Sequence, residues 1–132
     1  MNNFKFRGWD KVGQKGWVFG DLVHNQKVTK DGLEPRTMVG GYEVDEASVG
    51  LCTGLKDSKG TEIYQGDIIR VFYGGKKVFD APVVWNESYA AFLMDEGDMS
   101  YSPLPNADMD TQIRIEVIGN KYQKKYAKKN SA

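Results

Sequence analysis

The 132-residue sequence is poor in the side chains on which many catalytic sites depend. It contains one cysteine, Cys52, and therefore cannot form an internal disulfide, which is typical of a cytoplasmic protein. His24 is the only histidine and so the only imidazole that could activate a cysteine nucleophile. We interpret Cys52 as a small buried residue and His24 as an exposed residue in a turn, and we predict no catalytic residue and no enzyme activity.

Long apolar runs are also missing. No run approaches the roughly 20 residues that a membrane helix needs, and the amino end, MNNFKFRGWDK, has no apolar region of a signal peptide. We therefore expect a cytoplasmic protein with no membrane partner. With 40% hydrophobic and 27% charged residues, the composition is that of a globular chain, and the length fits one compact domain with a small appendage.

The formal net charge is zero, but the charges are unevenly distributed. Between Asp80 and Glu116 the only basic residue is Arg114, whereas the chain after Gly119 contains five lysines and no acidic residue. This asymmetry could steer a charged partner, or pair the tail of one subunit with the acidic face of another. It could equally serve solubility alone.

Alternation of apolar and polar residues predicts β-strands along most of the chain. In TQIRIEVIG, Ile113, Ile115 and Val117 fall on one face, which indicates a half-buried antiparallel strand. Two aromatic segments near the amino end, NFKFRGW and GWVFGDLV, flank DKVGQK and predict a hairpin. Glycines in TMVGGYEV and SVGLCTGL, on either side of DEA, favour bends or bulges over long regular strands.

The densest set of turn signals lies in GLKDSKGTEIYQGDIIRV. Asp57 and Gly60 predict a tight turn, and Gly66 with Asp67 predicts a second break before the next strand. One face of that strand is expected to hold Ile69, Val71 and Tyr73. Such closely spaced turns are typical of small, strongly curved barrels. The glycine spacing matches no phosphate-binding loop.

Two further segments, KVFDAPVVWN and YAAFLMD, predict strands around a tight turn. Ala81, Val83 and Trp85 share a face of the first, and Pro82 favours an edge or a bulge because it lacks an amide donor. The following DEGDMSYSPLPNADMD is polar, contains two prolines and predicts a long exposed loop. Only the tail after Gly119 favours a helix.

Four segments, in this order, resemble the YopX family of small phage and prophage proteins, mainly of Gram-positive bacteria: FRGWDKVGQKGWVFGDLV, VGLCTGLKDSKGTEIYQGDIIRV, VVW and EVIGNKY. The resemblance implies a mainly β protein, with an N-terminal β subdomain and hairpin at residues 1–50 and an SH3-like barrel at residues 51–120. It implies no established activity, so it assigns no catalytic, cofactor-binding or metal-binding residue. Two features depart from the family: Leu51 and Cys52 replace a polar and an aromatic residue, and the tail at residues 121–132 is basic.

The acidic segment is a candidate cation site. Its carboxylates belong to Asp95, Glu96, Asp98, Asp108 and Asp110. A hard cation needs several oxygens converging on one point, but the spacing is not that of an EF-hand. A metal-dependent hydrolase is therefore an alternative to a solvated acidic loop.

The tail NKYQKKYAKK is a candidate nucleic-acid-binding segment. If it is helical, its lysines form one stripe beside two tyrosines, and these residues are Lys121, Lys124, Lys125, Lys128, Lys129, Tyr122 and Tyr126. Lysines suit a phosphate backbone, and tyrosines can stack on bases. The alternative is a frayed, solubilising chain end, because ten residues rarely form a stable isolated helix.

Several aromatic residues could line a ligand groove, namely Trp9, Trp17, Phe19, Trp85 and Phe92. At strand spacing we interpret them instead as barrel core. Taken together, the sequence predicts a non-enzymatic binding or assembly module without a cofactor. Its partner would be another protein or a second copy of the chain, with nucleic acid as the alternative partner.

Overall fold

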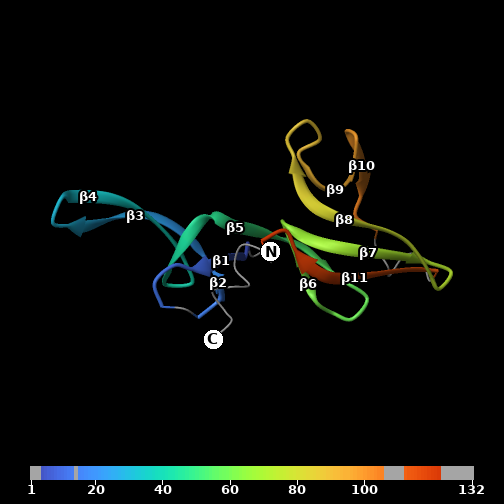
Figure 1. The fold of residues 1–132 in the computed structure, drawn as a ribbon, viewed down its shortest axis with the longest axis horizontal. Helices are drawn as coiled ribbons and strands as arrows, with labels where there is room; N and C mark the ends of the chain where they lie inside the picture. The colour runs from blue at the N-terminus through green and yellow to red at the C-terminus, as the bar shows by residue number, and fades with distance from the viewer. Residues whose placement is uncertain (1–3, 14, 106–111, 123–132) are drawn as a thin grey trace. The chain divides into compact units, whose positions relative to one another are not determined.

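The computed structural model describes residues 4–13, 15–105 and 112–122, and its regular elements in these ranges are β-strands (Figure 1). The described chain divides into two compact units, residues 4–51 and 52–122, and each is considered by itself. The prediction of a mainly β protein is confirmed. None of the described ranges contains a helix with the length and apolar character needed to cross a membrane.

The first unit is an antiparallel sheet with the strand order β2-β1-β5-β4-β3. Its strands are β1 (Phe6–Asp10), β2 (Trp17–Gly20), β3 (Leu22–Thr29), β4 (Gly32–Val39) and β5 (Tyr42–Lys56). The core of this unit consists of Val18, Val39 and Val44, with Phe6, Leu22 and Val49 packed against them. In β1 burial is not limited to alternate side chains, since Arg7, Trp9 and Asp10 are all buried.

The predicted amino-terminal hairpin is confirmed, and Asp10 organises its loop. The Asp10 Oδ1 atom accepts the backbone N–H groups of Val12 (3.1 Å) and Gly13 (2.9 Å), and Oδ2 accepts that of Lys15 (3.2 Å). The Gly13 N–H is the strongest influence on this carboxyl; together with the other two donors it outweighs burial and holds the pKa of Asp10 below its ordinary value.

The segment GWVFGDLV, expected to be one strand, is divided into two. Strand β2 ends at Gly20, whose φ of 144° is one that L-residues rarely adopt, and β3 begins at Leu22. Gly20 also lies close to the Gly40–Gly41 turn: a Cβ on Gly20 would lie 2.8 Å from the Gly40 Cα, and a Cβ on Gly40 would lie 2.3 Å from the Phe19 carbonyl oxygen. The division starts a hairpin that the sequence analysis missed, with β3 paired to β4 from Leu22 opposite Val39 to Thr29 opposite Gly32.

Strand β5 is fifteen residues long, although its glycines favoured short, bent segments. The predicted irregularities are present as bulges within this one long strand. Along β1, Arg7 pairs with Gly50 and Trp9 with Asp45, so β5 has extra residues at DEAS. A second register shift lies between Cys52 and Lys56, where β5 pairs with β6. The strand is therefore long but irregular, as its composition indicates.

The second unit contains a curled antiparallel sheet with the order β10-β9-β8-β7-β11, while β6 pairs with the end of β5 (Figure 1). Its strands are β6 (Glu62–Tyr64), β7 (Asp67–Tyr73), β8 (Lys76–Asn86), β9 (Ala91–Gly97), β10 (Ser100–Pro103) and β11 (Ile113–Asn120). Its core consists of Ile63, Ile69, Val71, Ala81, Val83, Met94 and Ile115.

The face assignments of β7 and β11 are largely confirmed. Ile115 is fully buried, and Ile113 and Val117 pack against the same core. In β7, Ile69 and Val71 are buried as predicted, but Tyr73 is exposed. Tyr73 pairs with Lys76 directly beside the Gly74–Gly75 turn, at the end of the β7–β8 hairpin.

The turn predicted at KDSKG is confirmed and does more than reverse the chain. Asp57 Oδ1 accepts the N–H groups of Lys59 (2.9 Å) and Thr61 (2.8 Å), and its Oδ2 accepts that of Val117 (2.9 Å). Ser58 exchanges two hydrogen bonds with Ile115, each 2.9 Å long. Residues 57–61, here called the cap turn, therefore cover the outer edge of β11.

The second predicted break is also confirmed. Gly66 has a φ of 93°, and the buried Asp67 carboxylate accepts the Tyr64 N–H at 2.7 Å. Pro82 lies in β8, opposite Ile68 of β7, and the ladder from β8 to β9 begins only at the next residue, Val83. The prediction that Pro82 would lie at an edge or a bulge is wrong, because β8 is the central strand of its sheet. The missing amide donor is tolerated because Pro82 lies just outside the part of β8 that pairs with β9.

Two expectations for the carboxy-terminal half need correction. The acidic segment predicted to be a loop instead forms the β9–β10 hairpin over its first half, with Ser100 opposite Gly97, and residues 106–111 lie outside the described ranges. The described chain contains no helix: Lys121 and Tyr122 form a turn, and the rest of the tail lies outside it. Within the described residues β10 and β11 are the two ends of the sheet order, so the SH3-like barrel stays a prediction.

Candidate interaction surfaces

Two of the seven predicted tail residues are described, and both hold the turn after β11. The Lys121 N–H donates to the Gly66 carbonyl at 2.8 Å, and the Tyr122 N–H donates to Asn120 Oδ1 at 3.0 Å. The Tyr122 ring packs so closely that a Cβ on Gly66 would lie 2.9 Å from its Cε2, and the Lys121 ammonium lies 5.1 Å from its centroid. Lys124, Lys125, Lys128, Lys129 and Tyr126 lie outside the described residues.

The described acidic residues serve the β9–β10 hairpin. Asp95 accepts the Gly97 N–H at 2.9 Å, Glu96 is hydrogen-bonded to Ser102, and Asp98 lies in the turn with a φ of 50°. Asp108 and Asp110 lie outside the described residues. Within residues 4–13, 15–105 and 112–122, no three histidine, cysteine, aspartate or glutamate side chains are grouped to hold a metal ion.

The aromatic residues do not form one core. Trp9 is buried and meets Trp17 edge to face, with ring centroids 5.4 Å apart, while the Arg7 guanidinium lies 4.7 Å from the Trp17 centroid. Phe19 and Trp85 are exposed, which contradicts the core interpretation for these two.

Cys52 and His24 each contact a glutamate rather than each other. The Cys52 thiol is half-buried and lies 3.4 Å from Glu62 Oε2. His24 is exposed as predicted, but it lies within β3 rather than in a turn, and its Nε2 is 3.6 Å from Glu46 Oε1. The first contact links the paired strands β5 and β6, and the second joins β3 to β5, the strand beyond its neighbour β4.

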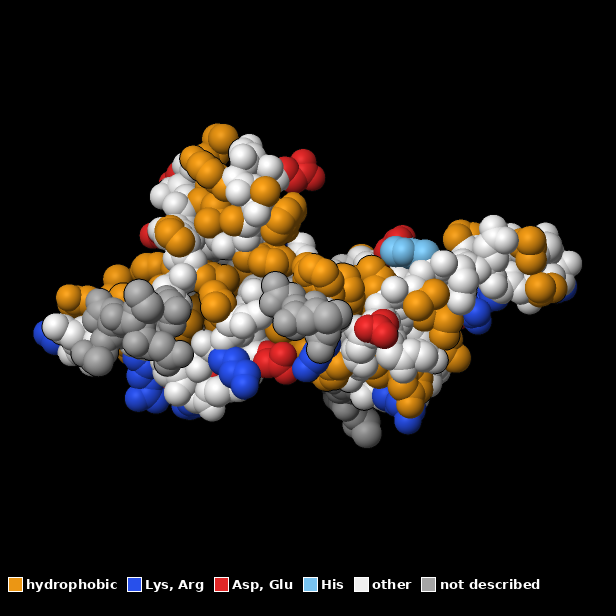
Figure 2. All heavy atoms as spheres, turned by 180° about the vertical axis from the view of Figure 1, so that it is seen from behind, with side chains coloured by type: hydrophobic (Ala, Val, Ile, Leu, Met, Phe, Trp, Pro, Cys, Tyr) orange, Lys and Arg blue, Asp and Glu red, His pale blue; other side chains and the backbone are white. Residues whose placement is uncertain are grey.

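The hairpin of β3 and β4, residues 22–39, is the surface that the sequence analysis missed. We call it the β3–β4 arm. Only its base continues into the sheet, where Met38 and Val39 pair with β5. At its far end, Val28 and Leu33 are directly opposed, and 84% and 64% of their respective surfaces are exposed. Figure 2 shows hydrophobic side chains gathered at this end.

The two faces of the arm differ in chemistry. Directly opposed residues share a face, so one face holds the pairs Leu22–Val39, His24–Thr37, Gln26–Pro35 and Val28–Leu33. The opposite face is apolar only at its base, where Val23 opposes Met38, and polar beyond it. There Lys27 Nζ contacts both carboxylate oxygens of Glu43 at 3.0 and 3.1 Å, and Arg36 Nε donates to Asn25 Oδ1 at 2.8 Å. The first face is therefore apolar at its base and at its tip.

The outer edge of β3 is the least protected sheet edge in the described chain. The cap turn covers β11, and β2 and β10 are four residues long, with Pro103 ending the latter. Strand β3 has eight residues, contains no glycine or proline and pairs with β4 without a register shift. Among the described strands none pairs with its outer side. Native proteins usually blunt such edges, because free backbone donors and acceptors bind other strands.

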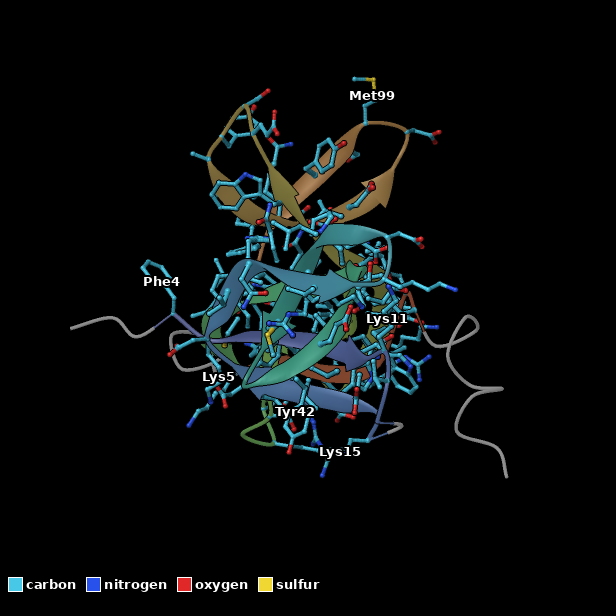
Figure 3. The ribbon with its side chains drawn as sticks, turned by 90° about the vertical axis from the view of Figure 1, so that its left-hand side faces the viewer. Phe4, Lys5, Lys11, Lys15, Tyr42 and Met99 are labelled. Carbon is cyan, nitrogen blue, oxygen red and sulfur yellow. The ribbon has the colours of Figure 1, made fainter. Side chains whose placement is uncertain are left out.

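Two smaller surfaces are also exposed. The β8–β9–β10 sheet and its turns carry several exposed large apolar residues, among them Trp85, Tyr89, Met99 and Tyr101, with Met99 in the β9–β10 turn (Figure 3). Trp85 contacts Phe92 edge to face at 5.1 Å. In the first unit, the Lys15 ammonium lies 5.2 Å from the ring centroid of the partly exposed Tyr42 (Figure 3).

A Lys-Asp-Gly sequence was the signal that could have revealed the arm. Asp31 and Gly32 form an Asp-Gly pair, which is typical of tight hairpin turns, although the segments on either side do not alternate between apolar and polar residues. Thr29 supports the turn, because its hydroxyl accepts the Asp31 N–H at 3.2 Å and donates to the Gly32 carbonyl at 3.1 Å. Pro35 weakened the pattern for a strand, but β4 tolerates it.

The fold places the chain in the class of small, mainly β proteins. It is similar to the crystal structure of protein EF1440 from Enterococcus faecalis, with a TM-score of 0.55 and 20% identity over 96% of this chain and 99% of that chain. At this identity the likeness shows the fold alone. The YopX family model, described as YopX protein, matches residues 5–125, so the chain belongs to the YopX family. The resemblance found in the sequence is thus confirmed. No curated protein matches the sequence.

Proposed function

We propose that this YopX-family protein is a non-enzymatic binding module that assembles with further copies of itself through uncovered β-strand surfaces. The observation that carries the proposal is the opposed pair Val28 and Leu33, which lies in water at the end of a two-stranded arm. Burying such side chains fully is worth about 1.5–3 kcal/mol each. A two-stranded hairpin is only marginally stable alone, so a partner would also stabilise the arm.

The family resemblance supports a proposal for where and when the protein assembles. It implies a phage or prophage protein, and we place the assembly in the bacterial cytoplasm during phage growth or lysogeny. We also interpret the second unit as an SH3-like barrel, in keeping with its five-stranded curled sheet. A nucleic-acid-binding accessory protein and a metal-dependent hydrolase remain the alternatives. The packing of Tyr122 against Gly66 disfavours base stacking by that ring.

Sedimentation velocity over a wide range of protein concentrations tests the proposal. We expect the average mass of the wild type to rise with concentration, and the double variant Val28→Lys/Leu33→Lys to stay monomeric. Losing two buried apolar side chains weakens association by at least about tenfold, because each 1.4 kcal/mol is a factor of ten. Val78→Lys is the matched control, since Val78 is also an exposed strand residue, but of the second unit. A wild type that remains monomeric throughout would overturn the proposal.

A further inference from the structure

We propose that a second copy of the chain pairs with the outer edge of β3, antiparallel to it, with Asn25 opposite Asn25 of the second copy. This inference rests on the proposed assembly role and adds the interface and its register. The two sheets would join into one continuous sheet, and the backbone groups on the outer side of β3 would find their partners. The pairing is isologous, so the same residues serve both copies.

Symmetry restricts the register. A two-fold axis perpendicular to the sheet keeps each face of β3 on the same side in both copies, so paired residues must both be even-numbered or both be odd-numbered. With Asn25 at the axis, Gln26 lies opposite His24, Lys27 opposite Val23, and Val28 opposite Leu22. The apolar tip of each arm then meets the apolar base of the other.

This register forms a continuous apolar row across the joined sheets. Leu33 and Val28 are already opposed in one copy, as are Leu22 and Val39. Placing Val28 beside Leu22 of the second copy brings all four side chains into line, and the symmetry repeats the row on the other side of the axis. Leu22 and Val39 belong to the core of the first unit, so the exposed tip residues would extend an existing core.

The neighbouring registers lack this match. Centring the axis on His24 places Gln26 opposite Leu22, and centring it on Gln26 places Val28 opposite His24. On the face that holds Val28, both registers leave an apolar residue against a polar one, and neither places Val28 beside an apolar residue of β3. The side-chain pattern of β3 therefore favours Asn25 at the centre.

Charge does not oppose the pairing. Strand β3 contains no acidic residue, and its single lysine, Lys27, is already paired with both carboxylate oxygens of Glu43 in the same chain. An edge lysine usually protects a strand from unwanted pairing, but a neutralised one repels a second copy much less. On the same face, Arg36 is held by Asn25 at 2.8 Å. The self-complementary apolar pattern favours a second copy over an unrelated strand.

Disulfide trapping tests the register. Cys52→Ser removes the native thiol, and Asn25→Cys, His24→Cys and Gln26→Cys are then compared under mild oxidation by oxidised glutathione. Opposed residues in antiparallel strands have Cα atoms 4.5–5.5 Å apart, within the 4.4–6.8 Å span of a disulfide, while diagonal positions are about 7–8 Å apart. We expect a covalent dimer from Asn25→Cys, forming at least about tenfold faster than from the two control variants.

The outcomes separate this inference from the proposed function. If the wild type self-associates but His24→Cys or Gln26→Cys cross-links fastest, or none does, the interface or its register is wrong while the assembly role stands. If the wild type is monomeric, both fall. Hydrogen exchange of the unmodified chain gives a second readout: amides of residues 22–29 should gain protection as the protein concentration rises. Unchanged protection there overturns the inference whatever the cysteine variants do.

Discussion

The cap turn should stabilise the second unit through the Asp57 carboxylate. Asp57→Ala removes an acceptor that serves three backbone N–H groups, those of Lys59, Thr61 and Val117. Water can replace the acceptor for the exposed Lys59 and Thr61, at a cost of about 0.5 kcal/mol each, the low end for a hydrogen bond. The half-buried Val117 N–H would be left unsatisfied, which costs about 1–3 kcal/mol. We expect the free energy of unfolding to fall by about 3 kcal/mol.

Urea unfolding combined with residue-resolved hydrogen exchange measures this effect. The Val117 amide should exchange faster in Asp57→Ala than in the wild type, and the urea midpoint should fall. Glu87→Ala is the control because it removes an exposed carboxylate from the β8–β9 turn of the same unit, where surface changes stay within about 0.5 kcal/mol. If Asp57→Ala unfolds like Glu87→Ala, or the Val117 amide keeps its protection, the cap turn does not stabilise the edge of β11.

The pH dependence of the same variant gives an independent check. Burial alone would raise the pKa of Asp57, but the N–H groups of Val117, Thr61 and Lys59 outweigh it, so the pKa lies below its ordinary value. A carboxyl with a depressed pKa stabilises the fold above its unfolded pKa of about 3.9, and this contribution is lost as the pH falls through the folded pKa. The stability difference between wild type and Asp57→Ala should therefore shrink below about pH 4. A constant difference would contradict the assignment.

Two other predictions follow from the same unit. Gly66→Ala should destabilise it by about 1–3 kcal/mol more than Gly60→Ala, because both glycines have φ near 90° but only Gly66 is in contact with Tyr122; equal losses in thermal melts would exclude the clash. For the tail, binding of labelled oligonucleotides should fall steeply with salt and vanish in a chain ending at Asn120 if the lysines contact phosphates. Salt-insensitive or tail-independent binding would eliminate that alternative.

The local chemistry of turns made much of the second unit predictable. Asp57 lies where the turn requires a carboxylate acceptor, and Gly60 and Gly66 lie where the backbone requires a positive φ. The residue types alone indicate these requirements in the sequence. Alternation likewise placed Ile115 in the core. What the sequence could not show is that Asp57 also accepts the N–H of Val117, since nothing local links two positions so far apart in the chain.

Exposure was harder to predict than strand position. Trp85 and Phe19 have strong strand patterns, yet both are exposed, because alternation assigns a face without saying whether another element covers it. The β3–β4 arm was missed for a related reason: polar residues fill the middle of both strands, so only the turn at Asp31 and Gly32 indicates a hairpin. The apolar tip thus became a candidate site only once the register paired Val28 with Leu33.

The cap turn also imposes an order of events on the growing chain. Asp57 and Ser58 are synthesised well before their partners in β11, which lie 60 and 57 residues further on. Until those residues leave the ribosome, β7 lacks the strand that pairs with its outer side, and its backbone groups can bind other chains. Contacts of such long range fold slowly. A nascent chain that stalls before Ile113 would therefore be a substrate for chaperones rather than a folded intermediate.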